Sequence, residues 1–168
     1  MHKAVASILL LLASTAAVGA TAWETYLKNP TPANAARVRA IQYSKSGHLS
    51  KGDLAVVSHQ VDLGREAAIR MLGRLVVTHR LSADTVEVLS QMLGTAARTN
   101  APAFLRAVGP RSNCFGVRPA GDNFVDRDDF RKSEADARAS ALRVVNAAEL
   151  VPTRDICLAQ LTKVGHGG

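Results

Sequence analysis

Apolar residues recur at helical spacing along most of the chain, and the pattern is clearest between residues 62 and 97. In the first half of this stretch, an apolar residue returns with each turn of 3.6 residues, as in an amphipathic helix. This face consists of Leu63, Ala67, Met71, Leu72, Leu75 and Val76. The second half repeats the pattern at Val86, Leu89, Leu93 and Ala96. We predict two helices here, capped by Asp62 and Ser82, and the short linker between them makes them antiparallel neighbours.

Similar but shorter patterns predict helices on both sides of this pair. Their ranges are 23–27, 32–41, 54–61, 102–108, 128–148 and 152–161. Three of them have start signals, namely Thr31 before Pro32, Ser50 before Asp53, and Asn100 before Pro102. The stripe predicted for 128–148 consists of Ala137, Ala141, Leu142, Val145 and Ala148. Residues 111–126 lack such a pattern and predict a long ordered loop, so the sequence indicates an all-α domain of about seven helices.

The first 22 residues have the three parts of a secretory signal peptide: a basic start, an apolar run and small residues before a cleavage site. Cleavage after Ala20 and cleavage after Ala22 both fit, and the second is preferred because Ala20-Thr21-Ala22 is a clean Ala-x-Ala. The sequence thus predicts a signal peptide over 1–22 and a single helical domain over 23–168. No later segment has 18 uninterrupted apolar residues, so we expect an exported protein, periplasmic or secreted, that is not an integral membrane protein.

Two cysteines, Cys114 and Cys157, are present in the chain. In an oxidising compartment an even pair is most simply one disulfide. A cysteine nucleophile or half of a metal site is the alternative, but the chain has neither a Cys-x-x-Cys motif nor a His adjacent to either cysteine. We therefore predict a bond between Cys114 and Cys157.

The charge balance indicates a partner. The chain has 47% hydrophobic residues, too many for a disordered protein, and its 21 basic and 14 acidic residues give a formal net charge of +7. Because an exported chain with 4% aromatic residues is not expected to bind nucleic acid, the basic excess indicates another protein or an anionic envelope component. A solvated surface without such a partner is the alternative. The candidate residues for this surface are Arg65, Arg70, Arg74, Arg106, Arg111 and Arg118.

Sequence motifs of catalysis and cofactor binding are absent. The chain has no Gly-rich phosphate loop, no His pair at metal-ligand spacing and no Gly-x-Ser-x-Gly elbow, so we predict no catalytic residue and no cofactor. Asp126, Asp128 and Asp129 are candidates for a metal site, but the spacing fails the calcium loop because Phe130 and Arg131 occupy two of its required positions. The other interpretation is that these carboxylates begin a helix, where free N–H groups favour them.

Two resemblances bear on fold and export. The helix pairs of residues 62–108, with their short turns, resemble HEAT- or armadillo-type helical arrays, which implies a HEAT-like stack as the form of the predicted bundle. Three further segments are similar to uncharacterised secreted bacterial α-helical proteins, which implies secretion from a bacterium and carries no activity. These segments are Asn29-Pro30-Thr31 with Asn34-Ala35, Ala103-Phe104-Leu105, and Arg154-Asp155-x-Cys157-Leu158.

Taken together, export, stacked helices and the absence of a catalytic motif favour a binding protein of the cell envelope without catalytic activity. Its specific form would be an inhibitor or immunity-type protein that acts against an envelope-acting toxin. The alternative is an envelope hydrolase that uses a pair of carboxylates brought together only by folding.

Overall fold

The computed structural model describes residues 20–43, 49–78, 81–110, 113–120 and 127–162. In these residues it contains eight helices and no strand, which confirms the all-α prediction. The bounds are α1 (Ala22–Lys28), α2 (Pro32–Arg37), α3 (Lys51–Asp62), α4 (Glu66–Val76), α5 (Ala83–Thr99), α6 (Ala101–Val108), α7 (Asp128–Arg143) and α8 (Val151–Thr162).

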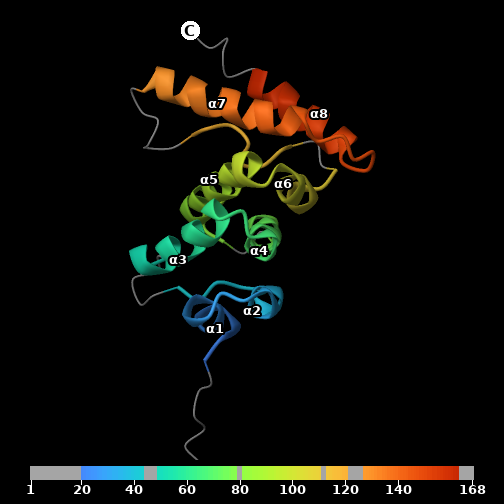
Figure 1. Ribbon diagram of the computed structural model, residues 1–168. Coiled ribbons are helices and arrows are strands. Elements are labelled where there is room, and N and C mark those ends of the chain that lie inside the picture. Colours follow the sequence, from blue (N-terminus) through green and yellow to red (C-terminus); the bar gives the residue numbers. More distant parts are fainter. Residues whose placement is uncertain (1–19, 44–48, 79–80, 111–112, 121–126, 163–168) are drawn as a thin grey trace, which may run out of the picture.

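The helices form a bundle of four consecutive pairs, stacked from α1 and α2 at one end to α7 and α8 at the other (Figure 1). Within the stack α3 contacts α1 and α5, and α5 contacts α7, so the odd-numbered helices form one row. The even-numbered helices form a second row in the same way, with the closest association between α4 and α6. Each inner pair is therefore covered by a pair on either side.

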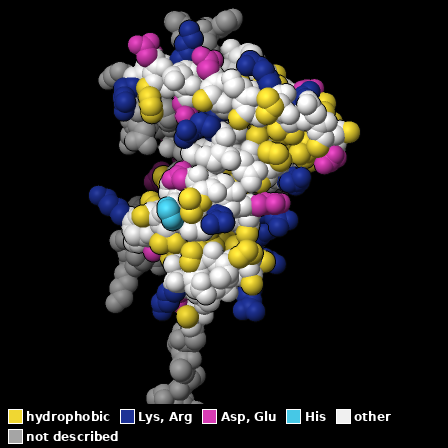
Figure 2. Space-filling model, viewed as in Figure 1, with side chains coloured by type: hydrophobic (Ala, Val, Ile, Leu, Met, Phe, Trp, Pro, Cys, Tyr) yellow, Lys and Arg dark blue, Asp and Glu magenta, His cyan; other side chains and the backbone are white. Residues whose placement is uncertain are grey.

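The two rows differ in charge. The odd-numbered helices carry nine acidic and seven basic side chains, whereas the even-numbered helices carry two acidic and five basic ones. Figure 2 shows Lys and Arg side chains gathered along the side of the molecule where α2 and α4 lie. Among the helices, the even-numbered row therefore carries a net positive charge and the odd-numbered row a net negative one.

Local sequence signals place most helix starts. Thr31, Ser50, Ser82 and Asn100 each accept a hydrogen bond from the backbone N–H three residues later, as predicted. Thr21 caps α1 in a reciprocal capping box with Glu24. Residues 1–19, which hold most of the predicted signal peptide, lie outside the described residues.

The predicted cap at Asp62 is wrong. Asp62 is the last residue of α3, and its carboxylate accepts a hydrogen bond from the Ser58 hydroxyl at 3.3 Å. The chain leaves α3 through Gly64, whose φ of 65° suits a glycine after a helix end. Leu63, predicted to belong to the apolar face of the next helix, is therefore 53% exposed. A glycine two residues past Asp62 was the overlooked signal.

Close packing of small residues brings the helices together. A Cβ atom on Gly73 of α4 would lie 2.7 Å from the carbonyl oxygen of Ala107 on α6, so the two helices pack more closely there than any side chain would allow. Leu72 of α4, Leu89 of α5 and Phe104 of α6 are fully buried in the core. None of the helices described is long and apolar enough to cross a lipid bilayer.

Candidate functional site

The loop between α6 and α7 is fixed to α8 by a disulfide. Cys114 and Cys157 are bonded with their Cα atoms 5.2 Å apart, which confirms the predicted pair. The Cys114 backbone N–H also donates to Oε1 of Gln160, at a donor–acceptor distance of 3.3 Å. On the chain-entropy account, closing a loop of 43 residues stabilises the folded state by about 4 kcal/mol.

A buried arginine of α7 attaches the same loop to the bundle. Arg138 is only 3% exposed, and its Nη1 donates to the carbonyl oxygens of Gly116 at 2.9 Å and Val117 at 3.1 Å. Its Nε donates to Glu134 at 2.9 Å. Burial lowers the pKa of Arg138, while the hydrogen bond and charge of Glu134 oppose that shift. Both Nε and Nη1 of this buried cation therefore donate hydrogen bonds within the fold.

The burial of Arg138 corrects the stripe predicted for this helix. The buried residues of α7 are Ala135, Arg138, Ala139 and Leu142. The helix ends at Arg143, so Val145 packs beyond it and Ala148 is exposed. The predicted stripe did not include this arginine, which its hydrogen bonds to the loop turn inward.

Two glycines allow the loop to lie directly on α5. A Cβ atom at Gly94 would come within 1.9 Å of the Gly116 carbonyl oxygen and 2.5 Å of Nη1 of Arg138. A Cβ atom at Gly116, which has a φ of 71°, would come within 1.8 Å of the Ser90 carbonyl oxygen. The described part of the loop is thus held by α8, α7 and α5 together.

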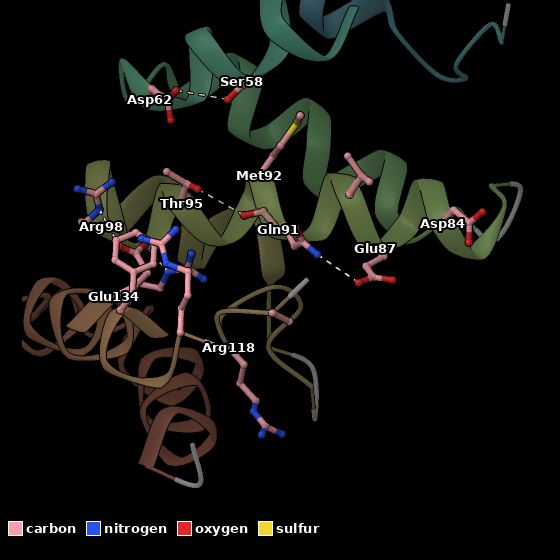
Figure 3. A pocket seen from close by; sticks show the side chains of 15 residues that line it. Ser58, Asp62, Asp84, Glu87, Gln91, Met92, Thr95, Arg98, Arg118 and Glu134 are labelled. Carbon is pink, nitrogen blue, oxygen red and sulfur yellow. Dashed lines mark hydrogen bonds and ion pairs between the residues drawn. The ribbon is translucent and has the colours of Figure 1, made fainter. Parts of the chain in front are cut away.

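This fixed loop forms one wall of a cleft of about 830 Å³ (Figure 3). Helix α5 lines its floor with residues from Asp84 to Arg98, α3 contributes Ser58 and Asp62, and α7 contributes the side chains from Phe130 to Arg138. A smaller hollow of about 270 Å³ continues between α5 and the loop. The cleft belongs to the odd-numbered row, opposite the basic side of the stack.

Charges of both signs line the cleft, and they are separated along α5. Figure 3 shows Asp84 and Glu87 toward one end of this helix and Arg98 toward the other. At the basic end, Arg98 lies 3.6 Å from Glu134, and the guanidinium carbon of Arg127 lies 4.5 Å from the centre of the Phe130 ring. The acidic and basic side chains of α5 therefore lie at opposite ends of the cleft, and Glu134 and Asp62 add carboxylates at the Arg98 end.

The predicted arginine surface is divided by the fold. Arg65, Arg70, Arg74 and Arg106 lie on or next to α4 and α6. Arg118 instead lines the cleft, where it makes no ion pair with any described residue. Arg111 lies outside the described residues.

The other chemical candidates are placed as follows. Asp128 and Asp129 occupy the first turn of α7, and Asp128 pairs with Arg131 at 2.7 Å, whereas Asp126 lies outside the described residues. No group of three His, Cys, Asp or Glu side chains that could hold a metal ion occurs among the residues described. Of the carboxylates that line the cleft, Glu134 is held by two arginines.

Sequence reasoning missed Arg98, Arg127, Phe130 and Glu134 as members of a site. A signal was present, because Arg127, Phe130, Glu134 and Arg138 recur at steps of three or four residues and so share one side of a helix. No family model, no curated protein and no solved structure matches the chain. Its function must therefore be inferred from the cleft itself.

Proposed function

We propose that the protein is an exported binding protein of the bacterial cell envelope, without catalytic activity, and that the cleft binds a protein partner. The observation that carries this proposal is the composition of the cleft. Phe130 is 46% exposed there, next to Arg127, and the partly buried Met92 lines the same cleft. Aromatic, Met and Arg side chains are enriched at protein interfaces, within a polar rim.

The rigidity of the cleft wall supports the same proposal. A surface that is fixed before binding loses less conformational entropy when the partner arrives. The disulfide and the Arg138 hydrogen bonds fix the loop without occupying the cleft floor. Separated charges would orient a partner segment, with its acidic groups toward Arg98 and its basic groups toward Asp84 and Glu87.

The disulfide also supports export, since such bonds persist in oxidising compartments. The specific form of the proposal is an inhibitor or immunity-type protein whose partner is an envelope-acting toxin. This step depends on the analogy with small exported helical inhibitors as a class. The hydrolase alternative stays open, with Asp62, Asp84, Glu87 and Glu134 as its carboxylates in the cleft.

The experiment is site-specific photocrosslinking in the periplasm of a bacterium that expresses the full chain. A photoreactive residue replaces Val88 or Thr95 on the cleft floor, and Ala159 on the exposed part of α8 is the matched control position. We expect one discrete protein adduct from both cleft positions and none from position 159. Adding Arg98→Glu and Arg127→Glu should remove the adduct by reversing the charge of the basic end.

Absence of an adduct from both cleft positions would contradict the proposal. The hydrolase alternative would replace it if the purified protein turned over a cell-wall substrate and Glu134→Gln or Glu87→Gln abolished that turnover. For the inhibitor form, the cross-linked partner should lose its toxicity when mixed with an equal amount of the wild-type protein, but not of the charge-reversed variant.

A further inference from the structure

A second surface lies on the opposite row of helices. In α2, α4 and α6 the charged residues are Arg37, Arg70, Arg74, Arg106 and a single carboxylate, Glu66. Arg70 and Arg106 share that carboxylate, at 3.8 Å and 3.7 Å, and both arginines are about half exposed. The carboxylate of Glu66 is thus the one negative charge on these three helices, where it is outnumbered by the arginines on this side of the stack (Figure 2).

Positive charges gather around Arg74 of α4, which contacts α2. Its Nη2 donates to the Ala35 carbonyl oxygen at 2.8 Å, and its buried Nε has no partner among the described residues. Burial lowers the pKa of Arg74, and the charges of Arg39 and Arg70 lower it further. Arg39 donates only to the backbone carbonyl oxygens of Ala36 and Val38. Within the described residues, therefore, no carboxylate neutralises Arg39 and Arg74.

The kind of partner follows from what this face lacks. The exposed large hydrophobic residues of the described chain are Leu63, Phe130 and Val144, and none of them belongs to α2, α4 or α6. A specific protein interface needs buried aromatic or aliphatic anchors at its centre, and the cleft offers Phe130 for that purpose. A face with exposed arginines and no such anchor fits the phosphate headgroups of a membrane instead. These headgroups are spread over a flat surface, and the attraction of basic side chains to them needs positive charge but no apolar anchor.

We propose that the face formed by α2, α4 and α6, with Arg39, Arg70 and Arg106 exposed on it, docks electrostatically on a membrane of anionic phospholipids. Because the two rows lie on opposite sides of the stack, a protein docked in this way keeps the cleft of α3, α5 and α7 open to a partner. Arginine suits this role because its planar guanidinium group forms paired hydrogen bonds with phosphate oxygens.

The test is co-sedimentation of the purified, disulfide-bonded protein with vesicles of phosphatidylcholine, with and without phosphatidylglycerol. We expect binding only to the anionic vesicles, and we expect it to weaken as salt shortens the range of the electrostatic attraction. Arg70→Gln with Arg106→Gln should lower the partition coefficient roughly 25-fold, because each arginine removed lowers it about fivefold. Both arginines are exposed, so the double variant should fold normally.

The matched control is Arg98→Gln with Arg127→Gln, which removes the same charge from the cleft on the other row. This variant should sediment like wild type while losing the crosslinked adduct of the cleft. Equal loss of sedimentation in both double variants would overturn the proposal, because net charge alone would then explain binding. Binding to soluble poly-glutamate without binding to anionic vesicles would also overturn it, in favour of an acidic protein. Neither outcome depends on whether the cleft has a partner.

Discussion

At the first end of the stack, α1 covers the bundle with Trp23 and Tyr26, whose rings lie 6.4 Å apart and whose side chains are almost fully buried. At the other end, α7 and α8 carry few large apolar residues, and a disulfide and the buried Arg138 join them to the loop. The first end thus depends on apolar burial and the last on specific polar and covalent bonds. The comparison shows that the end of a helix stack with few large buried side chains can be held by a disulfide and a buried arginine, and that the loop they fix forms one wall of the cleft.

The largest expected effect is from Arg138→Met. The substitution removes the hydrogen-bond donor of two loop carbonyl groups and one of the two arginines that hold Glu134, and breaking a largely buried ion pair in this way costs about 3–5 kcal/mol. Urea unfolding followed by circular dichroism measures the loss. The exposed Arg143→Met, on the same helix, is the control and should stay within about 0.5 kcal/mol of wild type. Equal stability of the two variants would mean that Arg138 does not hold this end together.

Removing the disulfide should have an effect of similar size. Cys114→Ser with Cys157→Ser should lower the free energy of unfolding by about 4 kcal/mol, because the unfolded chain regains the freedom of a 43-residue loop. Wild-type protein in reductant should show the same lowered melting temperature, with little change in its helical circular-dichroism spectrum. Reaction of both cysteines with a thiol reagent in the untreated native protein would contradict this account.

A single methyl group tests the contact between the loop and α5. Gly94→Ala should lower stability by about 1–3 kcal/mol, because the new Cβ atom overlaps the Gly116 carbonyl and the Arg138 guanidinium. Gly52→Ala is the matched control, since its Cβ atom would meet only the Ser50 hydroxyl at 3.7 Å. This variant should gain up to about 1 kcal/mol from the restricted unfolded chain. A loss of stability in both variants would indicate that the absence of a side chain at Gly94 is not required for the contact between the loop and α5.

The smallest effect at neutral pH is expected at the other end. The Tyr26 hydroxyl is buried without a partner among the described residues, so Tyr26→Phe should change stability by no more than about 1 kcal/mol. Burial raises the pKa of Tyr26 to about 12 from an ordinary value of 10.0. The unfolded chain therefore loses this proton first, and stability present below pH 10 is lost as the pH rises toward 12.

Unfolding measured across that pH range compares wild type with Tyr26→Phe. The wild-type protein should lose more stability than the variant, and Arg138→Met should leave that difference unchanged because it acts at the opposite end. Parallel curves for wild type and Tyr26→Phe would show that Tyr26 is not desolvated in the folded protein.

How far the site could be predicted depends on the range of the interactions. Ser82 and Asn100 were assigned as caps correctly because a cap bonds to residues three positions away. The members of the cleft come from four segments between Ser58 and Arg138, so no local pattern could join them. The arginine surface was grouped by charge alone, and the fold separated Arg118 from Arg70 and Arg106 onto opposite rows.

The sequence by itself determined the helical content, most helix starts and the pairing of the two cysteines. These follow from spacing, from capping residues and from there being a single way to pair two thiols. Only the tertiary structure decided that Arg138 turns inward and that one row of helices carries the cleft and the other the positive charge. A buried cation and a shared surface depend on which segments meet, and that is set by the packing of all the helices at once.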